Sequence, residues 1–257
     1  MVRVDTSLLE LAEEPGLWLP DEPARRVVAG PGYAVVTYGR SAWVHRLRLE
    51  AGAVAEAVEE VRAELRGRGL AEAVWWVGER SHPVDLAERL GLLGLVPDDP
   101  GELTTLSIGS RPAGEASVEV RRAGRLDDFV QALEIDWESF GFPADERAER
   151  RAAAQAAWPS IRADGRSSIY LAYLDGEPVG FGRSIFTPWG GLLLGGATLP
   201  AARGRGVYTS VVHARWAEAV ERGVPRLVVS AGPMSAPTLQ RLGFLRLGGV
   251  RLLRDRL

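Results

Sequence analysis

The four-residue stretch Arg-Gly-Arg-Gly occurs twice in the chain, at residues 66–69 and at residues 203–206. Arginine supplies the positive charge that binds a phosphate, and glycine lets an anion come close to the backbone. The helix beside each copy decides whether that chemistry is available. A helix begins with unpaired N–H groups and a partial positive charge, whereas it ends with unpaired carbonyl groups and a partial negative charge.

The two copies are predicted to lie at opposite ends of their helices. The first follows the amphipathic pattern "AVAEAVEEVRAEL", so its glycines are typical of a helix that ends there. The second follows the strand-like "LLLGGATL" and precedes a helix that we expect to begin near Val207. Only the second copy therefore predicts an anion site. A glycine-bearing turn that binds nothing is the alternative.

Two common nucleotide motifs do not fit the second copy. A P-loop needs a lysine, and all 31 basic residues of this chain are arginine. A Rossmann fingerprint needs a third glycine where Thr209 stands. The chain also has no cysteine and only three widely spaced histidines, so we expect neither thiolate chemistry nor a metal site.

The elements around the second copy form a regular series. Periodicity predicts two helices after residue 125, the second ended by Pro159, and then strands over 167–174, 177–186 and 190–199. A helix over 207–222, a strand, a short helix and a final strand-like segment follow. On the helix, Val207, Val211, Ala214 and Val220 are predicted to share the buried face.

The first half repeats the later part of this series, and "SHPVDLAERLGL" parallels "SAPTLQRLGF". We interpret this as a diverged internal duplication, with two chance-similar α/β units as the alternative. Pro, Gly and Ser cluster around residues 109–117, as in a linker. The predicted domains are residues 1–110 and 118–257, joined by residues 111–117.

The stretch "ATLPAARGRGVYTSVV", with "SAPTLQRLGF" after it, resembles the GCN5-related N-acetyltransferase (GNAT) family. The family's pyrophosphate motif reads R/Q-x-x-G-x-G/A, and Arg203, Gly206 and Tyr208 take its places, Tyr208 being a departure because it replaces a small residue. The resemblance covers about residues 118–257. It implies an α/β (α+β) fold of two tandem GNAT-like domains with mixed, mostly antiparallel sheets flanked by helices.

The resemblance also implies acetyl-CoA as cosubstrate. The backbone N–H groups of one segment would hold the pyrophosphate: Arg203, Gly204, Arg205, Gly206, Val207 and Tyr208. The end of the preceding strand, at Ala197, Thr198 and Leu199, would pair with the pantetheine arm. The corresponding place in the first half has no arginine but has acids at Glu50 and Glu56, so we expect that half to be degenerate and not to bind acyl-CoA.

Acyl transfer to an amine needs a base, a stabilised oxyanion and a proton for the leaving thiolate. We expect an N–H near Thr198 or Leu199 to meet the oxyanion. The family's usual tyrosine and asparagine fall at Leu239 and Gly232, so both are missing. Ser235 is the candidate proton donor, with helix N-cap as the favoured alternative. Glu138 is the candidate base among three neighbouring acids that also fit a solvated surface.

The expected function is an N-acetyltransferase acting on a primary amine of a small molecule or a protein N-terminus. A CoA-binding sensor or structural module without catalysis is the alternative. A net charge of −3 argues against nucleic-acid binding. The N-terminus lacks a signal-peptide pattern and no apolar run suffices for a membrane span. We therefore expect a cytoplasmic monomer or homodimer that does not contact membranes.

Overall fold

The computed structural model describes residues 6–257; residues 1–5, part of the segment examined for a signal peptide, lie outside the described residues. The helices are α1 (Thr6–Glu13), α2 (Pro15–Trp18), α3 (Val54–Gly67), α4 (Leu86–Leu92), α5 (Leu126–Ser139), α6 (Ala144–Asp164), α7 (Val207–Glu221) and α8 (Ala236–Arg241). The strands are β1 (Arg25–Gly30), β2 (Tyr33–Tyr38), β3 (Ser41–His45), β4 (Glu72–Gly78), β5 (Val96–Ile108), β6 (Glu119–Arg122), β7 (Ser167–Leu174), β8 (Glu177–Thr187), β9 (Gly190–Thr198), β10 (Leu227–Ala231) and β11 (Leu245–Arg256).

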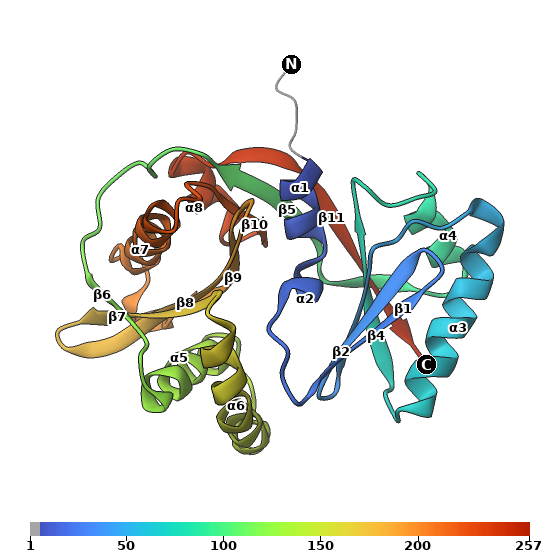
Figure 1. Ribbon diagram of the computed structural model, residues 1–257, viewed down its shortest axis with the longest axis horizontal. Helices are drawn as coiled ribbons and strands as arrows, with labels where there is room; N and C mark the ends of the chain where they lie inside the picture. The colour runs from blue at the N-terminus through green and yellow to red at the C-terminus, as the bar shows by residue number, and fades with distance from the viewer. Residues whose placement is uncertain (1–5) are drawn as a thin grey trace.

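The described strands form one mixed sheet in the order β1-β2-β3-β4-β11-β5-β10-β9-β8-β7-β6. Only β3 with β4 and β9 with β10 pair in parallel; the other neighbours are antiparallel. Helices flank the sheet in both halves of the molecule (Figure 1). The predicted α/β fold with a mostly antiparallel sheet is therefore confirmed.

The two halves exchange strands at the centre of this sheet. The C-terminal strand β11 lies between β4 and β5, and β5 lies between β11 and β10. Residues 250–256 of β11 pair with β4 of the first half, whereas residues 104–108 of β5 pair with β10 of the second. In Figure 1 these two long strands cross the middle of the molecule side by side. The predicted division into residues 1–110 and 118–257 stays a prediction, and both long strands pair across it.

A buried ion pair fastens the exchanged end of β11. Asp255 is completely buried, and its carboxylate accepts hydrogen bonds from the guanidinium of Arg62 on α3, the shortest at 2.8 Å. We expect Asp255→Asn to lower the free energy of unfolding by roughly 2 kcal/mol, because it removes one charge from a buried pair but keeps an acceptor. Urea denaturation measures this change.

Glu72→Gln is the matched control on the neighbouring strand. Glu72 pairs with Arg254 of β11 at 3.1 Å, but both side chains are substantially exposed. An exposed pair contributes little, so this variant should stay within about 0.5 kcal/mol of the parent. Equal losses in the two variants would mean that Asp255 does not fasten the strand.

The elements predicted around the second Arg-Gly-Arg-Gly copy are confirmed, with one wrong boundary. Helix α6 does not end at Pro159 but continues to Asp164, where Gly165 follows in the left-handed conformation. A proline removes one helical hydrogen bond. Here Ala157 and Ile161 are both buried, so the packed face of the helix continues past the proline and holds the next turn in place.

The buried face of α7 also differs from the prediction. Val207 and Val211 are buried as expected, but Val220 is 51% exposed and Ala219 is buried in its place. The predicted set missed Arg215 and Glu218, which are buried polar residues on the same helix. No helix among residues 6–257 is both long enough and apolar enough to cross a membrane.

Candidate acyl-transfer site

The turn before α7 exposes a series of backbone donors. Gly204 and Gly206 adopt the left-handed conformation, with φ of 75° and 77°, and Gly206 is the residue that caps the helix. The first hydrogen bond of the helix runs from the N–H of Ser210 to the carbonyl of Gly206 at 2.9 Å. The N–H groups of residues 204–209 therefore have no backbone acceptor in the described part of the chain. The second copy has the geometry of an anion site.

The hydroxyl of Ser210 forms hydrogen bonds that hold this turn in place. It donates to the carbonyl of Gly206 at 3.0 Å and accepts the N–H groups of Ser117 and Val118 at 2.9 and 3.2 Å. Ser210 is buried, and no motif or periodicity in the sequence singles it out. The last residue of the predicted linker is thereby attached to the first turn of α7.

The first copy lies where a helix ends, as predicted. Helix α3 ends at Gly67, and Gly69 has a φ of 70°. The N–H of Leu70 bonds to the carbonyl of Leu65 at 3.0 Å, which closes the last turn in the usual way. This end of the helix offers carbonyls, so it does not favour a phosphate.

The strand before the turn contains a bulge. On β9, Gly196 is opposite Gly182 and Leu194 is opposite Arg183, so Gly195 is the extra residue, and its φ is 56°. A bulge shifts the alternation of side chains by one residue. Beyond Leu192, β9 also has no partner on its other side, because β10 pairs only with residues 191 and 192. The strands separate, and an edge of β9 is left open between them.

The hydrogen bonds of β9 show which groups meet this open edge. The N–H of Leu199 bonds to the carbonyl of Val179 on β8 at 2.9 Å, so the expected oxyanion role of its N–H is wrong. Because successive N–H groups in a ladder alternate in direction, those of Thr198 and Gly196 point to the open side. The hydroxyl of Thr198 is also buried without a partner among the described residues.

The predicted loop arginines surround the turn with exposed charge. Arg203 donates from its Nε atom to the carbonyl of Thr198 at 3.3 Å, and Arg205 lies 3.5 Å from a carboxylate oxygen of Asp175. Val207 is buried, and Tyr208 is half-buried with its ring close to Gly196. Burial raises the pKa of the Tyr208 phenol, and the nearby Arg215 charge opposes this rise.

The three acids of α5 face different surroundings. Glu138 is exposed, and Glu134 is paired with Arg151 on α6. Asp136 follows Ala132 by four residues and therefore shares the face of α5 that packs on the sheet. Burial raises the pKa of Asp136 to about 6, against the charge of Arg150. Asp136 is thus more buried than Glu138, whose role as base stays a prediction.

The structure also shows the surroundings of Ser235, the candidate proton donor, and of Leu239, the position of the family's usual tyrosine. Ser235 precedes α8, but its hydroxyl bonds back to the carbonyl of Gly232 at 3.3 Å and makes no cap hydrogen bond, so the capping alternative is wrong. Its role as proton donor stays a prediction. Leu239 is completely buried in the cluster beneath α7 and α8, where it packs as an ordinary core residue.

Different helices cover the two parts of β9 that flank the bulge. On one face of β9, Leu192 and Leu194 pack against α1, whereas Ala197 and Leu199 pack in the cluster of α5 and α6. The bulge lies between these two pairs, and Gly195 itself is exposed. On this face of β9, the bulge therefore lies between the part covered by α1 and the part covered by α5 and α6.

The corresponding place in the first half is closed. A bulge is present after β3, where Arg46 has a φ of 56°, and β3 and β4 pair in parallel at only two positions. Here, however, the chain returns to the strand: the N–H of His82 bonds to the carbonyl of Leu47 at 3.0 Å, and the N–H of Leu49 bonds to the carbonyl of His82 at 3.1 Å. The edge that is open in the second half is therefore occupied.

Acidic side chains from the N-terminal segment lie against this closed edge. Glu14 is buried and bonds to Arg46 and Arg48 at 3.3 and 3.2 Å, and the carboxylate of Glu13 accepts the N–H of Glu79 at 2.9 Å. Burial raises the pKa of Glu13 to about 7. Such a lining is unfavourable for an anionic cosubstrate.

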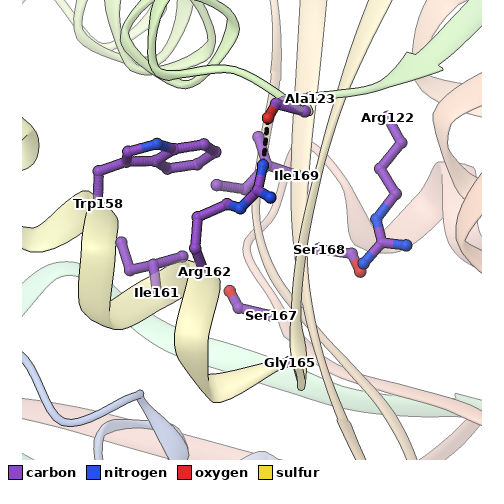
Figure 2. A pocket seen from close by; sticks show the side chains of 10 residues that line it. Arg122, Ala123, Trp158, Ile161, Arg162, Gly165, Ser167, Ser168 and Ile169 are labelled. Atoms are coloured by element: carbon purple, nitrogen blue, oxygen red, sulfur yellow. Dashed lines mark hydrogen bonds between the residues drawn. The ribbon is translucent and has the colours of Figure 1, made fainter.

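A cavity of about 350 Å³ lies elsewhere, between the end of α6 and the edge of the sheet. Figure 2 shows Trp158 and Arg162 on one side of β7 and Arg122 beside Ser168 on the other. Ser168 donates to Glu218, which lies near the C-terminal end of α7. The cavity is thus at the wrong end of α7 for a diphosphate, and it is distinct from the site predicted by sequence.

Comparisons with known proteins show which family and which folds this chain is similar to. Residues 129–244 match the family model described as the acetyltransferase (GNAT) family. A GCN5-related N-acetyltransferase from Kribbella flavida has a TM-score of 0.71 at 16% identity, over 99% of this chain and 96% of that chain. A tandem GNAT protein from the clavulanic acid biosynthesis pathway has a TM-score of 0.62 at 17% identity, over 95% and 87%.

A GCN5-related N-acetyltransferase from Sphaerobacter thermophilus has a TM-score of 0.59 at 18% identity, over 97% of this chain and 90% of that chain. At such identities the likeness establishes the fold alone, and it includes both halves. A search of the curated proteins returned no match.

Proposed function

We propose that this chain, whose residues 129–244 match the family model described as the acetyltransferase (GNAT) family, transfers an acetyl group from acetyl-CoA to a primary amine. The acceptor is a small molecule or the N-terminus of a protein. One observation carries this proposal: the exposed donors of residues 204–209 and the open edge of β9 adjoin each other along the chain. The diphosphate of acetyl-CoA needs the first surface, and the extended pantetheine arm attached to it needs the second.

Different groups of the chain bind different parts of acetyl-CoA. The N–H groups at the start of α7 hold the diphosphate, with Arg203 and Arg205 supplying formal charge around it. The pantetheine arm pairs with the open edge of β9 as an added strand, through Thr198. The orphaned Thr198 hydroxyl supplies a further hydrogen-bonding group in the same segment.

The reaction requires a base for the amine proton, a donor for the oxyanion and a proton for the leaving thiolate. The neutral amine attacks the carbonyl carbon of the thioester, the carbon–sulfur bond breaks, and the sulfur leaves as a thiolate. Asp136 takes the proton from the amine, because its pKa of about 6 leaves it ionised at neutral pH. The N–H of Gly196 meets the oxyanion, and Ser235 or a water molecule returns a proton to the thiolate.

The first half braces this site and binds no acyl-CoA. Its strand edge is closed by His82, and buried carboxylates line it. It also contributes α1, which covers Leu192 and Leu194 next to the bulge and so limits the acceptor's approach. A cytoplasmic location and a monomeric or homodimeric state stay predictions.

Release of free CoA thiol from acetyl-CoA, measured against a panel of amines, tests the proposal. We expect amine-dependent release, and calorimetry should give one acetyl-CoA site per chain. Binding without release under any amine would favour the alternative, a CoA-binding module without catalysis. The absence of both binding and release, with the fold intact by circular dichroism, would contradict the assignment of the site.

A further inference from the structure

Arg215 on α7 is a buried cation without an acidic partner. Its side chain is 1% exposed, and among residues 6–257 it forms no ion pair within 4.0 Å. Its Nη2 atom donates a hydrogen bond to the carbonyl of Gly195 at 2.7 Å, and its Nε atom has no partner in the described part of the chain. Burying a guanidinium with so few acceptors is costly, so packing alone does not account for it.

Two glycines make the space that Arg215 fills. Gly182 and Gly196 are opposite each other on β8 and β9. A Cβ atom on Gly182 would lie 1.7 Å from Nη2 of Arg215, and one on Gly196 would lie 3.0 Å from the same atom. The guanidinium therefore rests directly on the bulge, above the strand pair that borders the open edge.

The carbonyl that Arg215 binds and the N–H of Gly196 belong to the same peptide group. In a trans peptide these two groups point in opposite directions, so the N–H points away from the guanidinium, toward the open edge of β9. A charge-assisted hydrogen bond to the carbonyl oxygen polarises the peptide and strengthens its N–H as a donor.

We propose that Arg215 is a positioning residue that holds the bulge through the carbonyl of Gly195 and polarises the Gly196 N–H for the oxyanion of the transfer reaction. This inference rests on the proposed function, since it assigns a role within the same site. It also accounts for a buried cation behind β9, a strand that has no charged side chain.

Arg215→Met, which keeps an unbranched apolar stem but removes the charged guanidinium and its donors, is the test. Loss of a direct oxyanion donor lowers kcat by about 100-fold or more, and Arg215 acts one group further away, so we expect kcat to fall about 10-fold. The Kd for acetyl-CoA should change less than about threefold. Arg215→Lys keeps the charge and should recover part of the lost kcat.

Arg222→Met is the matched control. Arg222 is the C-cap residue of the same helix, about two turns beyond Arg215, and its Nε atom donates to Glu218 at 2.9 Å. This variant should lower the melting temperature without lowering kcat. If Arg215→Met and Arg222→Met change kcat equally, or if Arg215→Met lowers only stability, Arg215 has no positioning role.

Two further measurements keep the inference testable. Gly182→Ala places a methyl group where Nη2 now lies and should lower kcat as Arg215→Met does, even if the latter folds poorly. The amide proton of Gly196, followed by NMR, should move upfield in the Gly182→Ala and Arg215→Met proteins but not in Arg222→Met. An unchanged Gly196 signal would overturn the role of Arg215.

A wild-type protein that transfers no acetyl group would overturn the proposed function. The Gly196 amide signal would then still show whether Arg215 polarises this N–H.

Discussion

Asp136→Asn is expected to lower kcat for amine acetylation by about 100- to 1000-fold, the range in which general-base catalysis operates. Asparagine has nearly the same shape, so the helix and its packing should persist, but it cannot accept the amine proton. The pH dependence gives an independent signature. Since burial raises the pKa of Asp136 to about 6, kcat/KM of the parent, expressed per concentration of neutral amine, should rise as pH increases through 6 and then level off.

Glu138→Gln is the natural comparison, because Glu138 lies two residues away on the exposed side of α5. If Asp136 is the base, Asp136→Asn loses the rise near pH 6 and Glu138→Gln retains both the rise and the rate. The reverse pattern would restore Glu138, the base expected from the sequence. Two unchanged profiles would indicate that positioning alone, with water as the base, accounts for transfer.

Gly204→Asp is expected to weaken acetyl-CoA binding by roughly 50-fold. A carboxylate at this position would stand beside the diphosphate, and two such charges a few ångströms apart near a protein surface repel each other by about 2–3 kcal/mol. The substitution leaves room for itself, because a Cβ atom on Gly204 meets no other atom within 4 Å. Isothermal titration with acetyl-CoA and with CoA measures the effect.

Gly69→Asp in the first Arg-Gly-Arg-Gly copy provides a closely matched control. Gly69 has a φ of 70° and Gly204 a φ of 75°, and a Cβ atom added at either position would meet no other atom within 4 Å. The two substitutions should therefore carry a similar conformational cost, about 1 kcal/mol. Only Gly204→Asp should change the affinity for acetyl-CoA. Equal losses of affinity would refute the distinction between the two ends of a helix.

Much of the fold followed from local pattern. The strands β7, β8 and β9 and the helix α7 lie within a residue or two of their predicted bounds, because alternation, the Asp-Gly turn and helical periodicity are local signals. The position of β11 between β4 and β5 did not follow, because register between distant strands depends on tertiary packing that no local window contains.

The turn proposed to bind the cofactor was more predictable than the proposed catalytic groups. Gly204 and Gly206 reveal a left-handed turn by residue type alone. Arg215 appeared in the sequence as one arginine among many, and its importance follows from the glycines of two other strands that make room for it. Asp136 was one of three neighbouring acids, and only the packing of α5 shows which of them faces the sheet.

The exchange of β5 and β11 has a consequence for biosynthesis. A ribosome releases the chain from its N-terminus, so the first half emerges with a vacancy between β4 and β5 that only the 12 residues of β11 can fill. Until then its sheet presents unpaired edges, which are prone to pairing with other chains. Neither half can therefore mature independently during translation, and a premature stop codon ahead of β11 would damage the half that was synthesised first.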